Sequence, residues 1–259
     1  MTGDDTAVLA NLPALAFGFA LVMARVAAAV MLLPGLGEAE LPVMVRAALA
    51  LVLSVLLLPV LQPELPALPE SPGATLQLIA AETLTGIWLG WLARMVMLAL
   101  PVAGQIAASV LGLTNVLQPD VTLGPQTASL ARLFATAGPV LLFATGLHAL
   151  PLSALAGSFA VIPPGAVLPA GDMVQAASEA VSGSFALGLR LAAPFVLAGT
   201  VWQVGLGLAA RLVPQHQIYF VALPGQILGG LLLLGLLASA VLGAWQDTAA
   251  DLLAALPGL

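Results

Sequence analysis

The stretch AALALVLSVLLLPVLQP (Ala47–Pro63) contains no charged residue, and Ser54 and Gln62 are its only polar side chains. A helix needs about 20 apolar residues to cross the hydrocarbon core of a bilayer, so a run of this kind predicts a membrane helix. Further charge-free runs follow the same pattern: Ala7–Ala24, Met95–Pro119, Leu133–Gly171, Leu191–Ala210 and Leu212–Gln246. Together they indicate an integral membrane protein.

The composition of the whole chain supports this class. Of 259 residues, 61% are hydrophobic and only 7% are charged, against about 25% charged in a soluble domain. No room remains for a separate soluble domain. The chain has no cysteine, so disulfides, thiolate metal sites and cysteine nucleophiles are excluded.

The few charges exclude one further class of function. All six basic residues are arginines, spread singly along the chain, and twelve acids give a net charge of −6. Nucleic-acid binding needs a basic patch along the phosphate track, and this sequence has none. The isolated arginines also give no basis for predicting membrane orientation from loop charge.

The breaks between apolar runs predict an all-α protein. Segments dense in Pro and Gly cannot continue a helix, and they divide the chain into helical hairpins of one domain, residues 1–259. The expected helices are 7–33, 43–62, 74–100, 103–116, 128–157, 173–210 and 216–244.

Prolines and small residues predict how these helices behave. Kinked or interrupted helices are expected at Pro101, Pro139, Pro151, Pro194, Pro214 and Pro224, because each removes a backbone donor. Gly86 and Gly90 lie four residues apart on one helix face, where another backbone can approach closely. That approach is explained equally well by packing within the chain and by contact with another subunit.

The segment AGQIAASVLGLTNVLQPDVTLGPQT (Ala103–Thr127) differs from the other loops. It begins as an apolar helix and then mixes Thr, Asn, Gln, Pro, Asp and Gly with Val and Leu. An ordinary exposed loop explains its polar and helix-breaking residues, but it does not require the valines and leucines.

Chemistry inside the membrane is weakly supported. His148 is five residues from Ser153 and ten from Ser158, and neither spacing places a base beside a hydroxyl on one helix face. His148 and His216 lie 68 residues apart with no acid cluster, so no metal site is expected. We expect neither catalytic residues nor a cofactor.

An ion-coupled carrier is a stronger alternative, because carriers use broken helices and intramembrane charges. The candidate charges are Glu82, Arg94, Arg132, Glu179, Arg190 and Arg211. Each arginine is equally compatible with snorkelling to water or with an acid on another subunit. From the residues alone, a subunit of a larger membrane machine is favoured over a carrier.

Four collinear stretches resemble the FliR family, the R component of the flagellar type III export gate, whose injectisome counterparts share the fold. They are RVAAAVMLLPGLGEAELPVMVRAALALVLSVLLLP (Arg25–Pro59), AGQIAASVLGL (Ala103–Leu113) with LARLF (Leu130–Phe134), GLHALPLSALAGSFAVIPPG (Gly146–Gly165) and GLAARLVPQHQIYFVALP (Gly207–Pro224). Their order and spacing match the family over most of residues 20–235.

The resemblance implies a role without substrate turnover. FliR-like subunits assemble with FliP-like and FliQ-like subunits into a closed helical conduit for unfolded flagellar proteins, and an FlhB-like subunit binds its outside. The implied location is the bacterial inner membrane within the flagellar basal body, largely on the periplasmic side, in contact with membrane lipid. A flagellar and an injectisome assignment both remain open.

The resemblance also implies a plug, a loop of the R subunit that projects into the closed channel. By position, the plug residues are Gly112, Leu113, Thr114, Asn115, Val116, Leu117, Gln118, Pro119, Asp120, Val121, Leu123 and Gly124. Candidate subunit-interface residues are Arg132, His148, Arg211 and Gln215, together with Gly86 and Gly90. Pro119 precedes Asp120 here, whereas family members commonly show the opposite order.

Overall fold

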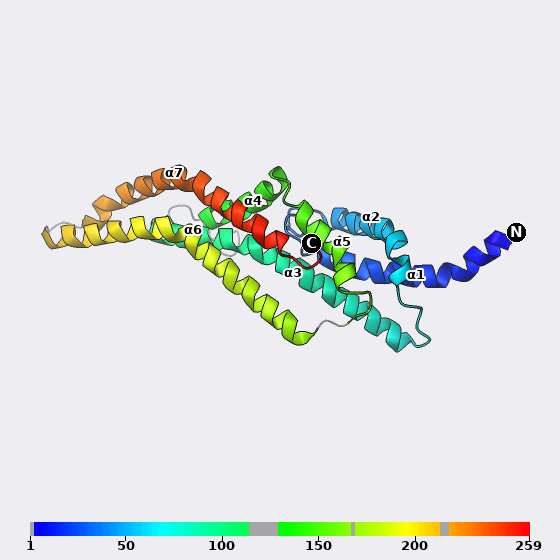
Figure 1. The fold of residues 1–259 in the computed structure, drawn as a ribbon. Coiled ribbons are helices and arrows are strands. Elements are labelled where there is room, and N and C mark those ends of the chain that lie inside the picture. The colour runs from blue at the N-terminus through cyan, green and yellow to red at the C-terminus, as the bar shows by residue number, and fades with distance from the viewer. Residues whose placement is uncertain (1–2, 114–128, 167–168, 213–217) are drawn as a thin grey trace. The chain divides into compact units, whose positions relative to one another are not determined.

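A computed structural model describes residues 3–113, 129–166, 169–212 and 218–259 (Figure 1). Within these ranges it contains seven α-helices, one short 3-10 helix and no strand, which confirms the all-α prediction. In chain order the elements are α1 (Gly3–Val30), α2 (Val43–Leu61), η1 (Gln62–Glu64), α3 (Pro72–Val110), α4 (Ser129–Ala144), α5 (Ala149–Val161), α6 (Ala170–Leu212) and α7 (Ile218–Ala254).

Length and composition make several of these helices candidate membrane spans. Among the described residues, five helices are long and apolar enough to cross a bilayer, and α4 with α5 forms a bent pair that would supply a sixth. The α2 helix, predicted at 43–62, ends at Leu61. The α1 and α6 helices also lie within a few residues of their predicted ranges.

The prediction of two helices at 74–100 and 103–116 is wrong, because α3 continues through Pro101 as one helix. Pro101 has no N–H to donate to the Met97 carbonyl four residues earlier, yet the helix continues without that bond. The neighbouring Val96 carbonyl accepts a bond of 3.2 Å from Trp245 Nε1. Prolines also lie inside α4, α6 and α7 without ending them: Pro139, Pro194 and Pro224. A proline inside a helix of this chain therefore removes one hydrogen bond without ending the helix.

The predicted helix 128–157 is also wrong, since α4 ends at Ala144 and α5 begins at Ala149 after a bend of 71°. Gly146 causes the break: its φ of +78° lies in the left-handed region that ends helices and that favours glycine. A glycine rather than a proline therefore interrupts this helix.

The α7 helix was predicted to stop at residue 244 but continues to Ala254. Buried side chains recur at four-residue spacing through this extension, at Trp245, Ala249 and Leu253. The prediction ended where charged residues begin, yet Asp247 and Asp251 lie on the exposed side of the same helix.

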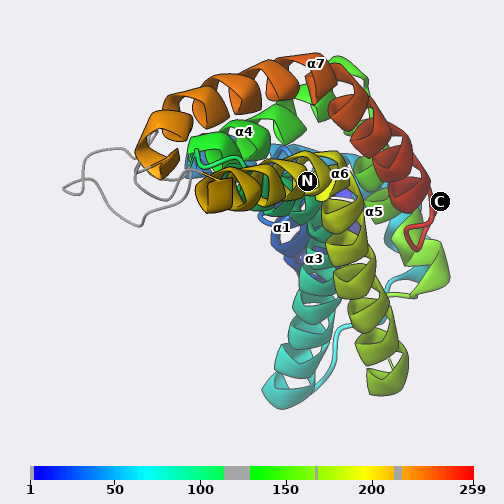
Figure 2. The same cartoon turned by 90° about the vertical axis from the view of Figure 1, so that its left-hand side faces the viewer.

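The chain forms two compact units. Unit 1 comprises residues 1–94, 145–179 and 252–259, and unit 2 comprises residues 95–144 and 180–251. The single domain expected from the sequence stays a prediction. In unit 1, α2 packs against α1, and Ser54 Oγ lies 3.3 Å from Met23 Sδ. In unit 2, the start of α7 lies beside the end of α6 as a helical hairpin (Figures 1 and 2).

Candidate functional site at the end of helix α3

The end of α3 leads directly into the predicted plug, and a glycine cap fixes this end. The Leu113 N–H donates to the Ala108 carbonyl at 2.9 Å, and Gly112 has a φ of +72°. This is the geometry of a Schellman cap, in which a left-handed residue after the helix lets the next N–H reach back by five residues. The helix therefore ends at Val110, and the prediction of helix to residue 116 is wrong.

Two glycines let α6 and α7 hold this end of α3 closely. A Cβ added at Gly199 of α6 would collide with the Val110 side chain. At Gly230 of α7, an added Cβ would lie 3.1 Å from Leu111 Cβ, and Leu111 is buried. The root of the loop is consequently fixed between two helices of the same unit.

Gln226 of α7 supplies the polar contact at the root. Its Nε2 donates to the Val110 carbonyl at 3.4 Å, and the side chain is 8% exposed. The last carbonyls of a helix lack intrahelical donors, so Gln226 serves as a side-chain cap. The same amide lies over Gly112, where an added Cβ would be 2.8 Å from Nε2. A larger residue at position 112 would displace this cap.

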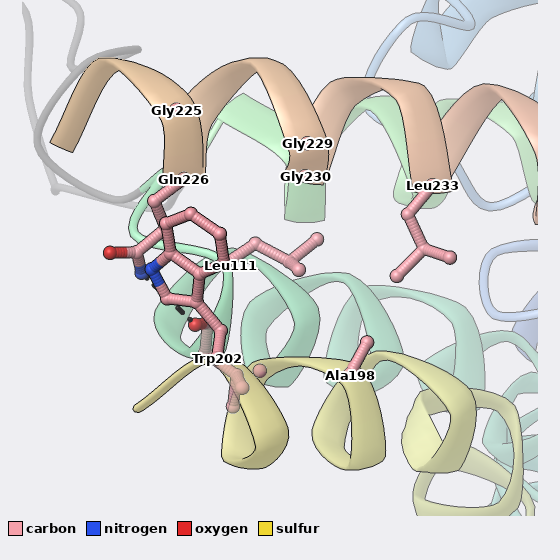
Figure 3. Close-up of a pocket in the computed structure, with 10 residues that line it drawn as sticks. Leu111, Ala198, Trp202, Gly225, Gln226, Gly229, Gly230 and Leu233 are labelled. Carbon is pink, nitrogen blue, oxygen red and sulfur yellow. Dashed lines mark hydrogen bonds between the residues drawn. The ribbon is translucent and has the colours of Figure 1, made fainter. Parts of the chain in front are cut away.

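A cavity of about 230 Å³ lies beside the cap (Figure 3). Its walls come from α3, α6 and α7, and the glycines of α7 leave it open. Figure 3 shows Trp202 of α6 and Gln226 of α7 pointing toward each other at one end, and Leu233 at the other. The lining is mainly apolar, which suits apolar side chains rather than a charged ligand.

Only the first two predicted plug residues, Gly112 and Leu113, fall in this site. Leu113 is 1% exposed and therefore belongs to the core of unit 2. The others lie outside the residues that the structure describes: Thr114, Asn115, Val116, Leu117, Gln118, Pro119, Asp120, Val121, Leu123 and Gly124. The plug therefore stays a prediction, with a defined point of attachment.

The predicted interface residues are distributed over both units. In unit 2, Arg132 lies on α4 and Arg211 in the last turn of α6, and both are exposed. In unit 1, the half-buried His148 is the residue before α5. Gln215 lies outside the described residues. Their role in contacts with other subunits stays a prediction.

Gly86 and Gly90 face α1 within unit 1. A Cβ at Gly86 would collide with the Arg25 carbonyl oxygen, and one at Gly90 would lie 2.7 Å from the Ala29 carbonyl oxygen. The close helix approach that their spacing predicts is thus made inside this chain. No contact with another subunit is needed to explain either glycine, and that interface role stays a prediction.

Sequence reasoning missed a buried ion pair in unit 1. Arg25 of α1 donates to both carboxylate oxygens of Glu82 of α3, from Nε at 2.7 Å and from Nη2 at 3.1 Å. Both side chains are 0% exposed. Removing charges from water costs several kcal/mol per ion, so the two-point geometry and further bonds are needed to offset that cost.

Further partners complete this junction. Arg25 Nη1 donates to Ser158 Oγ at 3.3 Å, and the guanidinium carbon lies 4.1 Å from the Phe159 ring centroid. Glu82 Oε1 also accepts the Gly165 N–H at 2.6 Å. Residues from α1, α3, α5 and the turn after α5 therefore meet at one charge pair.

The carrier and enzyme alternatives lose support from these contacts. Glu82 is paired with Arg25, and Arg94 Nη2 donates to Glu38 Oε2 at 3.3 Å. The Ser158 hydroxyl donates to the Leu155 carbonyl at 2.7 Å while accepting from Arg25. Across the described part of the chain, no three acidic, histidine or cysteine side chains are grouped to hold a metal ion.

The fold and its apolar helices define a polytopic helical membrane protein. The family described as "Bacterial export proteins, family 1" matches residues 16–252. The chain is 32% identical over 234 residues to flagellar biosynthetic protein FliR of Caulobacter vibrioides, covering 90% of this chain and 93% of that protein. It therefore belongs to the FliR family of bacterial export proteins.

More distant relatives match the same region. The FliR protein of Bacillus subtilis is 27% identical over 214 residues, covering 81% of each chain. The FliR protein of Escherichia coli K12 is 27% identical over 215 residues, covering 82% of this chain and 81% of that protein. The resemblance inferred from four sequence stretches is thus confirmed. The chain is a flagellar export protein of the FliR family.

Proposed function

We propose that this chain is a core subunit of the flagellar type III export gate. With FliP-like and FliQ-like subunits it forms a closed conduit for unfolded flagellar proteins, with an FlhB-like subunit outside, in the inner membrane within the basal body. The observation that carries the proposal is the family match through residues 16–252. That match includes the loop region and both units.

Exposed apolar helix faces support a role inside an assembly. The windows Val43–Glu64 and Ala222–Ala254 are each only 11% buried within the chain. Large apolar side chains such as Met44, Leu232 and Leu236 are at least two-thirds exposed. Surfaces of this extent must be covered by lipid or by other protein.

The ion-coupled carrier is the alternative, and the charge contacts argue against it. A carrier needs a titratable group free to bind its ion during transport. Glu82 is held by Arg25 and by the Gly165 N–H, whereas Glu38 is bonded to Arg94. Breaking the contact between Arg25 and Glu82 would leave an unpaired charge in the buried core of unit 1.

The loop after α3 is proposed as the plug of the gate. A plug must seat in a constriction and also leave it, so its closed and open states should differ by only a few kcal/mol. Val116, Leu117, Val121 and Leu123 supply apolar contacts. The Gly112 cap and the Gln226 contact support this role, because a movable segment needs a fixed root.

Complementation tests the gate assignment. The gene is expressed in a motility-deficient strain that lacks its own FliR subunit, and restored swimming is expected. Co-expression with FliP-like and FliQ-like subunits should give a complex in detergent. A protein that purifies alone as one species and drives ion-coupled uptake into liposomes would support the carrier.

Shortening the loop between Thr114 and Leu123 tests the plug. Assembly with the partner subunits should be unchanged, while the membrane becomes leaky to ions and small molecules because the seal is lost. Asp120→Asn is the control, since it keeps the loop length and its apolar residues. A shortened variant that assembles and stays tight would rule out the plug.

A further inference from the structure

An apolar groove follows α3 in unit 2 and also touches α4 and α6. It is lined by residues of α3 between Met95 and Gln105, by Ala131 of α4, and by Val181, Ser184 and Phe185 of α6. Its volume is about 390 Å³, and all of its residues belong to unit 2. We call it the α3 groove. It shares no residue with the cavity drawn in Figure 3.

Two close helix contacts accompany the groove. A Cβ added at Gly104 of α3 would lie 2.8 Å from Ala131 Cα of α4, and one at Gly188 of α6 would lie 3.0 Å from Val102 Cγ1 of α3. The small residues Ala131 and Ser184 are buried in its lining and leave it unfilled. The groove is therefore a product of the packing of three helices within one unit.

The surface around the groove is apolar and open. Leu98, Val181 and Phe185 line it, and their side chains are 43%, 42% and 58% exposed. Its α3 and α6 residues belong to candidate membrane spans. A bilayer brings acyl chains to an apolar surface of this kind, because the hydrocarbon core surrounds the spanning helices.

The dimensions suit one hydrocarbon chain and exclude a helix. Met95 and Gln105 are ten residues apart, which is about 15 Å along α3. Dividing the volume by this length gives a mean cross-section of about 26 Å². A helix with side chains is 10–12 Å wide, so its cross-section is about 80 Å² or more. A partner helix could only lie over the groove, whereas an extended acyl chain enters it.

An arginine lies beside one end of the groove. Arg132 directly follows Ala131, which lines the groove and packs against Gly104 one residue before Gln105. Its side chain is exposed, and it has no acidic partner among the described residues. The groove lining itself contains no charged residue. The Gln105 end therefore combines an apolar channel with one uncompensated cation.

The acids in the described part of unit 2 lie elsewhere. Asp247 and Asp251 belong to the last turns of α7. Trp245 of the same helix donates to the Val96 carbonyl, which lies near the other end of the groove. The local charge at Arg132 is thus positive, although the whole chain has a net charge of −6. That charge favours an anionic ligand.

We propose that the α3 groove binds one acyl chain of an anionic phospholipid and that Arg132 binds its phosphate. A guanidinium donates two N–H groups to a phosphate in a fixed geometry, and basic residues beside grooves of membrane helices bind anionic headgroups. The acyl chain then extends from the Gln105 end toward Met95. This inference rests on the membrane helices and not on the gate assignment. It gives Arg132 a lipid partner in place of the subunit contact expected from the sequence.

Photo-crosslinking of the full-length chain tests the site. The chain is reconstituted into phosphatidylcholine vesicles that contain a small amount of phosphatidylglycerol with a diazirine in one acyl chain. Mass spectrometry then locates the cross-linked peptides. Cross-links should concentrate on Met95–Gln105 and Val181–Phe185, relative to the exposed α7 peptide around Leu232, which reports general contact with the bilayer.

An arginine variant tests the headgroup contact. Arg132→Gln should lower cross-linking in the groove by about fivefold, the effect of one basic residue near an anionic lipid surface. Arg190→Gln is the matched control, because Arg190 is also exposed but lies 200° around α6 from the Gly188 contact. It should cross-link like wild type. Phosphatidylcholine with the same diazirine should label the groove more weakly, since its headgroup has no net charge.

A blocking variant tests the channel. Val181→Trp should reduce cross-linking in the groove to the level of the α7 reference peptide, because the indole fills the space that the acyl chain needs. Val201→Trp is the control, since Val201 is exposed on the same helix and does not line the groove. Leu98→Trp repeats the block from α3, so a folding defect of one variant does not decide the result.

Two outcomes would overturn the proposal. If Arg132→Gln and the blocking variants cross-link like wild type, the groove only touches bulk lipid. If the groove loses its cross-links when the chain is assembled with FliP-like and FliQ-like subunits, a subunit covers it in place of lipid. Retained cross-links in that complex, still dependent on Arg132, are the expected result.

Discussion

The two units differ in how they satisfy their arginines and glycines. In unit 1, Arg25 and Arg94 are paired with acids, and Gly86 and Gly90 lie against α1. The third arginine of this unit, Arg46, has a buried Nε without a hydrogen-bond partner among the described residues. In unit 2, the arginines on α4 and α6 have no acidic partner among the described residues, and several glycines inside helices face open space: Gly183, Gly205, Gly207, Gly229, Gly235 and Gly243. The open helical glycines of unit 1, Gly73 and Gly171, lie only in the first turn of a helix.

This difference separates internal packing from surfaces left for other molecules. Where a glycine lies against the backbone of another helix, close packing accounts for the glycine, because any side chain there would push the two helices apart. A helical glycine with open space in front costs stability and gains nothing inside the chain. The packed glycines of unit 1 are therefore explained by contacts within the chain, whereas several helical glycines of unit 2 are not.

The largest expected effect is loss of the buried acid in unit 1. Glu82→Ala should destabilise the protein by about 3–5 kcal/mol, because Arg25 would remain as an unpaired buried charge. Thermal unfolding in detergent measures the loss. The matched variant Arg25→Met with Glu82→Leu removes both charges and should retain most of the stability. If Glu82→Ala and this double variant unfold at the same temperature, the loss of stability does not come from an unpaired charge.

A smaller loss is expected from Gly86→Ala. The new methyl group would collide with the Arg25 carbonyl oxygen, and forcing helices apart in a packed core costs about 1–3 kcal/mol. Chemical unfolding of the purified protein checks the value. Gly73→Ala is the control, since a Cβ at Gly73 meets nothing within 4 Å. Equal stability of Gly86→Ala and wild type would contradict the close packing of α1 on α3.

In unit 2, Gln226→Ala should cost about 0.5–1.5 kcal/mol, the usual value of one hydrogen bond. The Val110 carbonyl loses its donor, so the root of the loop should also loosen. Hydrogen exchange at Leu113 reports that loosening directly. Gln226→Glu tests the donor itself, because a carboxylate of the same shape cannot donate to a carbonyl. Unchanged exchange in both variants would exclude the cap.

The smallest effect has the opposite sign. Gly229→Ala should stabilise the isolated chain by about 0.5–1 kcal/mol, since the helix gains propensity and the methyl group meets no neighbour. Thermal unfolding of the chain without partners is the measurement. A loss of stability would mean that the open glycines of unit 2 resemble the packed ones of unit 1, and the contrast between the units would disappear.

Much of the fold was predictable because helix length and apolar content are local properties. The α2 prediction ended one residue from the observed helix. The predicted helix bounds were wrong where a single proline or glycine can either end a helix or lie within one. Pro101 continued a helix that it was expected to end, and Gly146 ended a helix that was expected to continue. Which outcome occurs depends on packing between elements that are far apart in the sequence.

The contacts of the site were harder to predict for the same reason. Gln226 is an isolated polar residue in a long apolar helix, a signal that was available but unused. Arg25 and Glu82 are 57 residues apart, and no spacing rule joins side chains on different helices. Glycine spacing correctly indicated close helix approach at Gly86 and Gly90, but it could not identify the neighbouring helix as α1.

The Gly165 N–H bond to Glu82 has a consequence for biosynthesis. Arg25 and Glu82 can neutralise each other as soon as α3 leaves the ribosome, but Gly165 is made 83 residues after its acceptor. Glu82 Oε1 also accepts from Arg25 Nη2, so this oxygen can be hydrogen-bonded before Gly165 is made. The order of synthesis therefore allows the two charges to pair before the turn after α5 is attached.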